Sequence, residues 1–320
     1  MICETFNMAP NTKSKIVSIL MPVYKGERFV GRAIESVLGQ TYPHIELIIV
    51  NDGSPDSSAE IIKPYLTDRR VKYIEQRNAG VAAARNTALQ HATGAYTGLC
   101  DQDDEWLPHK AEKQVAYLEA HPEVGLVHGD VDYIDEAGQP LPHEPYFPAA
   151  VSGDCFPRMY MGNPVMAVAA MFRWSVIDAV GGFDPTIKYA DDYDLWLRIA
   201  AHHDVGYIDE PVARYRWHAA NNSHHQIAIR EYTLRVLRKA ERELPDACAH
   251  VPRNDRKLRY FRLYEQMGRY ANAESSPLAA TGYALKAFAW DPWRAANDVI
   301  PASVRNRAAW YWSRIRRTRS

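Results

Sequence analysis

The sequence of 320 residues has few cysteines and no long apolar run. Its four cysteines, Cys3, Cys100, Cys155 and Cys248, form no CxxC pair. That spacing argues against a zinc knuckle and a disulfide framework, and it favours a reduced, cytoplasmic compartment. No apolar stretch is long enough to span a bilayer. The N-terminus has no basic segment followed by an apolar one, so no signal peptide is predicted.

The chain also lacks a net charge of either sign, although its two parts differ. The formal net charge of −1 argues against a bulk nucleic-acid binder. Residues 1–225 hold 19 Lys and Arg against 30 Asp and Glu, whereas residues 226–320 hold 19 against 9. This split predicts an acidic catalytic part and a basic part that meets something anionic. A basic, solvated helical face docked on the acidic part explains it equally well.

Neither GxGxxG nor GxxxxGK[ST] follows the first predicted strand, so a dinucleotide fold and a P-loop are not expected. Instead, apolar runs predict strands at 15–24, 45–54, 71–76 and 96–100. Helical spacing predicts helices at 27–40, 57–68 and 79–92. This βα alternation predicts an α/β fold whose mostly parallel central sheet is flanked by helices, with function at the carboxyl ends of the strands.

The rest of the chain predicts a second part of the sheet and then helices. We expect a helix at 108–120, one or two strands at 124–135, and a strand, short helix and glycine turn at 166–184. A helix at 189–202 and a strand, turn and strand at 205–218 follow. Beyond residue 221 the pattern is helical. The expected division is an N-terminal extension (1–14), a catalytic domain (15–222) and a C-terminal helical region (223–320).

The stretch CDQDDEW places Asp101, Asp103 and Asp104 together after a buried strand. Like charges this close repel unless something neutralises them. A hard divalent cation suits them, because Mg²⁺ or Mn²⁺ takes one or two protein carboxylates and completes its shell from water and phosphates. The alternative is that Asp103 or Asp104 caps the helix that follows.

Four segments in order resemble glycosyltransferase family 2 over residues 15–220. They are VSILMPVYKGERFVGRAIESVLGQTYPHIELIIVNDGSPDSS, NAGVAAARNTAL, DQDDEWLPHKAEKQ and GGFDPTIKYADDYDLWLRIA. The resemblance implies an inverting, metal-dependent transferase with the GT-A fold. It departs from the family at Asn51, where the family more often has Asp, and at Asp191, where it usually has Glu.

The resemblance also implies roles for individual residues. Asp192 matches the catalytic base, with Asp191 beside it, and Asp103 matches the metal ligand, with His218 as a further ligand. Gly181, Gly182 and Trp106 are expected at the pocket for donor and acceptor. The residues expected to bind the nucleotide are Pro22, Val23, Tyr24, Glu27, Asp52, Arg85, Asp101 and Gln102.

The resulting expectation is an enzyme that uses Mn²⁺ or Mg²⁺ and moves a sugar from a nucleotide-diphosphate sugar, most simply a UDP-sugar, to a glycan or lipid-linked acceptor. Bacterial cell-surface polysaccharide synthesis is the expected setting. The alternatives are a metal-dependent phosphohydrolase and a sugar-nucleotide-binding subunit without turnover. The tail at 301–320, basic and aromatic, is expected either to contact an anionic membrane or to pack on the catalytic domain.

Overall fold

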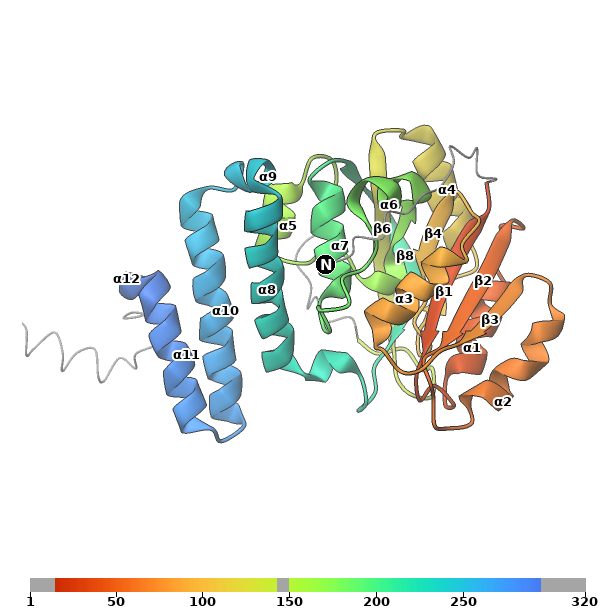
Figure 1. Cartoon of the computed structure of the whole chain (residues 1–320), viewed down its shortest axis with the longest axis horizontal. Helices are drawn as coiled ribbons and strands as arrows, with labels where there is room; N and C mark the ends of the chain where they lie inside the picture. Colours follow the sequence, from red (N-terminus) through yellow and green to blue (C-terminus); the bar gives the residue numbers. More distant parts are fainter. Residues whose placement is uncertain (1–14, 143–149, 295–320) are drawn as a thin grey trace, which may run out of the picture.

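The computed structural model describes residues 15–142 and 150–294. Within them an eight-stranded sheet has the order β3-β2-β1-β4-β7-β6-β8-β5. The strands are β1 Val17–Val23, β2 Ile45–Asn51, β3 Val71–Glu75, β4 Tyr96–Leu99, β5 Glu105–Trp106, β6 Val124–Ile134, β7 Met171–Arg173 and β8 Asp204–Arg216. The four N-terminal strands run parallel, as does the β6–β8 pair, while β7 and β5 pair antiparallel with their neighbours. The expected mostly parallel sheet flanked by helices is therefore confirmed (Figure 1).

The sheet separates two hydrophobic cores, because successive side chains of a strand point to opposite faces. Ile19, Met21 and Ile49 pack on one side with helices α1 and α4, whereas Leu20 and Ile48 pack on the other with α3 and α7. The helices over this part of the chain are α1 Val30–Leu38, α2 Ser58–Ile62, α3 Val81–Gln90, α4 Lys110–Ala120, α5 Phe156–Met161, α6 Trp174–Val180 and α7 Asp191–Ala200. Short 3-10 turns occupy Lys63–Thr67, Ala167–Ala169 and Asn222–His224.

The strand order places the functional edge of the sheet. β1 has β2 on one side and β4 on the other, so the chain connections leave β1 in opposite directions. In open α/β sheets such a switch point opens a crevice at the carboxyl ends of the strands. The loops after β1, β2 and β4, which hold Tyr24, Asp52 and Asp103, converge there.

The sequence prediction was wrong about several elements of the second half of the sheet. Where a strand, turn and strand were expected at 205–218, residues 204–216 form one continuous strand, β8, and the expected turn is a register shift opposite Gly129 and Asp130. Residues 124–134 form a single strand, which is one of the two arrangements predicted for that segment. The short strand β5 was not predicted, because two residues carry no periodic pattern. Nor does Asp104 cap a helix, since α4 begins at Lys110 with His109 at its N-cap.

The C-terminal helices are α8 Gln226–Glu243, α9 Pro245–Ala249, α10 Arg253–Ala273, α11 Pro277–Trp290 and α12 Pro292–Arg294. Figure 1 shows α8, α10 and α11 stacked side by side, with α8 nearest to α7 and the sheet. Leu237, Phe261 and Met267 from these helices belong to the same buried core as Trp196 of α7. The predicted boundary at residue 222 thus lies in a turn, but the helices beyond it share one hydrophobic core with α7.

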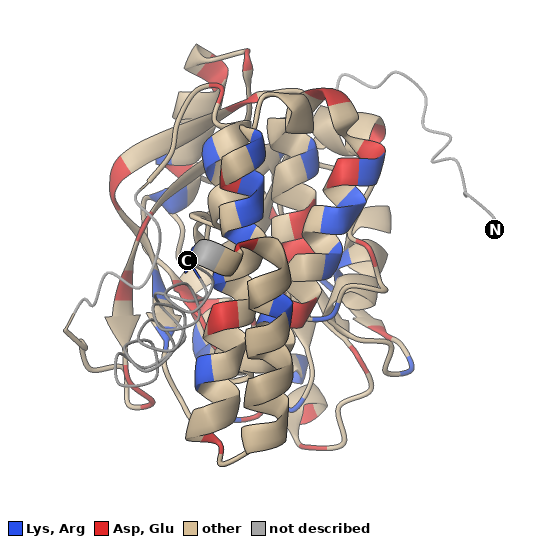
Figure 2. Ribbon diagram, turned by 90° about the vertical axis from the view of Figure 1, so that its left-hand side faces the viewer, with Lys and Arg blue, Asp and Glu red and all other residues tan. Residues whose placement is uncertain are grey.

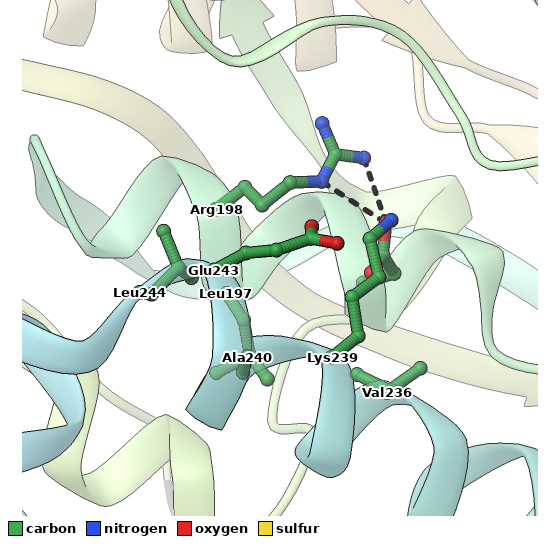
Figure 3. A pocket seen from close by; sticks show the side chains of 8 residues that line it. Leu197, Arg198, Val236, Lys239, Ala240, Glu243 and Leu244 are labelled. Carbon is green, nitrogen blue, oxygen red and sulfur yellow. Dashed lines mark hydrogen bonds and ion pairs between the residues drawn. The ribbon is translucent and has the colours of Figure 1, made fainter. Parts of the chain in front are cut away.

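A charged network adds to this attachment between α7 and α8. Asp194 accepts from Arg198 on its own helix and from Lys239 of α8 at 3.0 Å, and Lys239 also reaches Asp184 at 2.7 Å. Figure 3 shows Arg198 and Lys239 converging beside a cavity of only about 10 Å³. The cavity has at most the room of one water molecule. We therefore take this pocket as a helix–helix contact and not as a ligand site.

Candidate active site

An open cleft of about 760 Å³ lies at the carboxyl ends of β1, β2, β4 and β8. Eight of the residues predicted for the site line it, namely Pro22, Val23, Tyr24, Asp52, Asp101, Gln102, Asp103 and His218. Its volume is in the range of small-molecule sites. Residues that lie up to about two hundred positions apart in the chain are thus brought to one place. Glu27, Arg85, Trp106, Gly181, Gly182, Asp191 and Asp192 do not line this cleft.

Asp103 and His218 form a pair at the cleft, with 2.9 Å between the imidazole Nε2 and the carboxylate Oδ2. Two neighbouring ligands of an octahedral cation at about 2.1 Å lie roughly 3.0 Å apart, so the pair has the spacing of two metal ligands. No group of three or more such ligands occurs among the described residues. A pair suffices for Mg²⁺ or Mn²⁺, which completes its shell from water and substrate phosphate.

A fully buried arginine, Arg216, fixes the loop that carries Asp103. Its Nε donates to the Asp103 carbonyl at 2.9 Å, and its own backbone N–H donates to the Asp104 carboxylate at 3.0 Å. Its guanidinium also pairs with Glu105 and donates to the Asp135 carbonyl. The sequence analysis assigned no role to Arg216, although this residue lies only two positions before His218. The strands β8 and β4 thereby hold the two halves of the Asp103–His218 pair together.

Asp52 is buried at the end of β2, where its side chain accepts three hydrogen bonds. The donors are Gln76 Nε2 at 2.7 Å, Ala79 N at 2.9 Å and Gly80 N at 2.9 Å. The carboxylate therefore fixes the turn that leads into α3 and still lines the cleft. A carboxylate has about four acceptor positions, so one remains for a ligand.

Two predicted nucleotide-binding residues connect loops to one another. Gln102 accepts from Tyr24 N at 2.7 Å and donates to Tyr24 O at 2.9 Å, which ties the acidic loop to the end of β1. Glu27 accepts from Ser57 N at 3.0 Å, away from the cleft. Backbone contacts of this kind hold the floor of the cleft in place, so both residues shape the site.

Arg85 of α3 lies between two acidic segments. It is 3% exposed and donates to Asp191 at 2.7 Å and to Asp101 at 2.7 Å. Burial disfavours its charge, but Asp101, Asp191 and Asp192 outweigh that effect and raise the pKa of Arg85. Arg85 was expected to bind the nucleotide, whereas in the structure its guanidinium forms ion pairs with these carboxylates.

Asp192 follows this ion pair at the first turn of α7 and remains partly exposed. Its carboxylate accepts a hydrogen bond from Tyr193 N at 2.7 Å. Burial, followed by repulsion from Asp191, raises the pKa of Asp192 to about 7. The pKa of Asp191 is also raised, first by burial, although Arg85 opposes the shift. A carboxylate with a pKa near neutrality is suited to accept a proton.

The glycine pair and Trp106 take structural positions. Gly181 ends α6 with φ 79°, a conformation that favours glycine. A Cβ on Gly182 would lie 2.6 Å from Asn86 Oδ1, which itself accepts from Phe183 N. Trp106 is 3% exposed and donates to the Leu99 carbonyl at 2.9 Å. None of these three residues lines the cleft.

Three cations that the sequence reasoning missed, Lys25, Arg28 and Lys188, also line the cleft. Lys25 holds φ 57°, a left-handed conformation that costs a non-glycine residue about 1 kcal/mol or more. Its N–H donates to Ser54 Oγ at 3.0 Å, which fixes that turn. Because these cations line the same cleft as the carboxylates, the cleft is suited to an anionic ligand that binds together with a metal ion.

Comparisons with known proteins agree with this arrangement, beginning with the fold. A mannosyltransferase from Pyrobaculum calidifontis, solved with GDP-Man and Mn²⁺, aligns with a TM-score of 0.62 at 20% identity, over 88% of this chain and 82% of that one. Staphylococcus aureus TarS 1-349, solved with UDP, aligns with a TM-score of 0.55 at 14% identity, over 86% and 88%. The fold is GT-A.

The sequence comparisons define the family. The model for glycosyl transferase family 2 matches residues 18–169. The uncharacterized glycosyltransferase RP339 of Rickettsia prowazekii is 30% identical over 225 residues, which are 68% of each chain. The chain therefore belongs to glycosyltransferase family 2. Two other Rickettsia relatives are much longer, and the chain spans only 32% and 34% of their lengths.

Proposed function

We propose that the chain transfers a sugar from a nucleotide-diphosphate sugar to an acceptor hydroxyl, with inversion at the anomeric carbon. The observation that most directly supports this proposal is the Asp103–His218 pair at the switch point of a GT-A sheet. Residues 15–222 are the catalytic part in this proposal, and residues 223–320 are the helical region behind it. A glycan or lipid-linked acceptor in bacterial cell-surface polysaccharide synthesis is the proposed setting.

The donor set of the pair suits a divalent cation held jointly with the substrate. Asp103 Oδ2 and His218 Nε2 would bind it, and the remaining positions would go to phosphate oxygens and water. When bound, such an ion supplies Lewis-acid stabilisation of the charge that develops on the leaving diphosphate. An imidazole ligand favours Mn²⁺ over Mg²⁺, since Mg²⁺ prefers oxygen. Lys25, Arg28 and Lys188 add positive charge on the same cleft.

Asp192 is the proposed base. With a pKa of about 7 it is half ionised near neutral pH, so it can accept a proton from an attacking hydroxyl and still be available as the anion. Arg85 holds the neighbouring carboxylate of Asp191 and leaves Asp192 without a cationic side-chain hydrogen bond among the residues described. Transfer in one displacement, with the base and the leaving diphosphate on opposite faces of the sugar, gives inversion.

The hydrogen bonds of Asp52 favour uracil as the nucleotide base. Three of about four acceptor positions on this carboxylate are taken by Gln76, Ala79 and Gly80. Uracil presents a single N–H, which needs the one position that remains. Guanine presents an N–H together with an amino group and would compete with the turn for a second position. Thymine presents the same single N–H, so the count argues against GDP-sugars, and UDP-sugars are the proposed donors.

The test is a panel of UDP-, GDP- and TDP-sugars, screened for a rise in melting temperature with Mn²⁺ and with EDTA. A ligand that binds the folded state alone raises the apparent stability by mass action. We expect the largest rise with UDP-sugars and Mn²⁺, and release of UDP on incubation. Release of phosphate, or of UMP and a sugar phosphate, would indicate a phosphohydrolase. Binding without any release over a broad acceptor panel would indicate a non-catalytic subunit.

A further inference from the structure

The helix α11 presents an apolar face that no described residue covers. Its inner side packs on α10, where Ala287 is buried and Trp290 stacks on Tyr260 with 4.2 Å between ring centroids. On its outer side Leu278 is 91% exposed and Leu285 is 67% exposed. These two leucines and Phe288, which is 47% exposed, are the three most exposed large apolar side chains among those whose burial the structure describes.

The three side chains share one face of the helix. Leu278 and Leu285 are seven residues apart, and Phe288 follows three residues later, which is the spacing of neighbours along a helical stripe. Lys286 is the single charged residue in the fourteen of α11. Figure 2 looks onto this end of the molecule, where the foremost helical ribbon is almost wholly tan. An apolar surface gathered in this way marks an interaction site.

Charge decides among the partners that could cover it. The neighbouring α10 holds six Lys and Arg against two acidic residues, and α10 and α11 pack along their length. In the sequence, residues 291–320 hold seven Arg against two Asp. The chain's own basic tail would thus lie against a basic helix, and a second copy of this face would bring like charges together. An anionic lipid surface satisfies both features, because it accepts apolar side chains and attracts the flanking cations.

We propose that α11 docks the protein on an anionic phospholipid bilayer, with Leu278, Leu285 and Phe288 inserted below the headgroups. A helix of fourteen residues is about 21 Å long. That length is too short to cross the hydrocarbon core, so α11 lies in the plane of the interface. None of the helices described is long and apolar enough for a membrane span. Apolar insertion and a basic flank are the two signals that make interfacial binding stable.

The experiment is flotation of the whole chain with vesicles of phosphatidylcholine alone, or with about a third phosphatidylglycerol, at about 0.05 M and about 0.5 M salt. The variant is the double substitution Leu278→Asp and Leu285→Asp, which keeps the basic tail. The matched control is Leu66→Asp, which changes a leucine that is 42% exposed and lies outside α11. Thermal unfolding and circular dichroism without vesicles show that each variant is folded.

We expect binding to the anionic vesicles at low salt, reduced about tenfold or more by the double substitution and by high salt, and unchanged in Leu66→Asp. Equal binding of the double variant would overturn the proposal and assign the contact to the tail. A dimer in light scattering that dissociates on the double substitution, without vesicle binding, would assign the face to a second copy. The absence of both would mean that the chain covers α11 itself. No outcome depends on the proposed transferase activity.

Discussion

The substitution Asp192→Asn tests both the proposed base and the electrostatics that surround it. It removes the carboxylate and keeps the size of the side chain. Because the donor site is built from other residues, we expect nucleotide binding to persist while transfer falls by about 10²-fold or more, a common contribution of a general base. If Asp192→Asn remains active and Asp191→Asn is inactive, the base is the neighbouring residue.

The same substitution carries a stability signature whose sign follows from the raised pKa. The carboxyl group has an ordinary value of 3.8 and a folded-state pKa of about 7. The folded protein therefore holds a proton that the unfolded chain has lost between pH 4 and 7, and stability falls as the pH rises through that window. A shift of about three units corresponds to at most about 4 kcal/mol. Since Asp192 is partly exposed, about 1–2 kcal/mol is a realistic gain for Asp192→Asn.

Urea unfolding between pH 4 and 8 measures this gain, with a control of opposite sign. Burial would raise the pKa of Asp184, but hydrogen bonds from Lys239 and Thr186 lower it to about 2. Asp184→Asn should thus lose stability by nearly the same amount at every pH between 4 and 8, because its contribution disappears only below about pH 4. Asp192→Asn should gain stability above pH 7 and match the unmodified protein near pH 4. A pH-independent difference, or a loss at pH 8, would refute the argument.

Three further predictions concern the other parts of the site. Asp103→Ala and His218→Ala should each weaken Mn²⁺-dependent UDP binding in calorimetry without changing binding in EDTA; full activity of Asp103→Ala with Mn²⁺ would exclude the metal role. Arg216→Met should cost about 3–5 kcal/mol in urea unfolding, because it leaves the Glu105 carboxylate without its buried partner, and a cost below about 1 kcal/mol would contradict this. Asp52→Asn should reduce the preference for UDP over GDP in thermal-shift assays, and an unchanged ratio would argue against base recognition by Asp52.

The sequence predicted those features of the fold that rest on local pattern. Apolar runs such as VSILMPV and IELIIVN form β1 and β2, and both strands are buried throughout. The acidic loop could be found because its carboxylates are adjacent in the chain. The contacts that determine the role of each carboxylate could not be predicted, since Arg85 and Asp191 are 106 positions apart in the chain and Arg216 and Asp104 are 112 apart. The bulge in β8 and the two-residue β5 likewise depend on pairing between distant strands.

Buried arginines explain how five neighbouring aspartates can differ in function. The guanidinium of Arg85 donates hydrogen bonds to Asp101 and Asp191, and the backbone N–H of Arg216 donates one to Asp104. Two carboxylates remain without a hydrogen bond from Lys or Arg among the residues described. Asp103 faces His218 at the spacing of two metal ligands, and Asp192 has only a backbone donor. Because Asp103 lies beside a second potential metal ligand, it is suited to hold a cation. Because the pKa of Asp192 is raised, Asp192 is suited to take a proton.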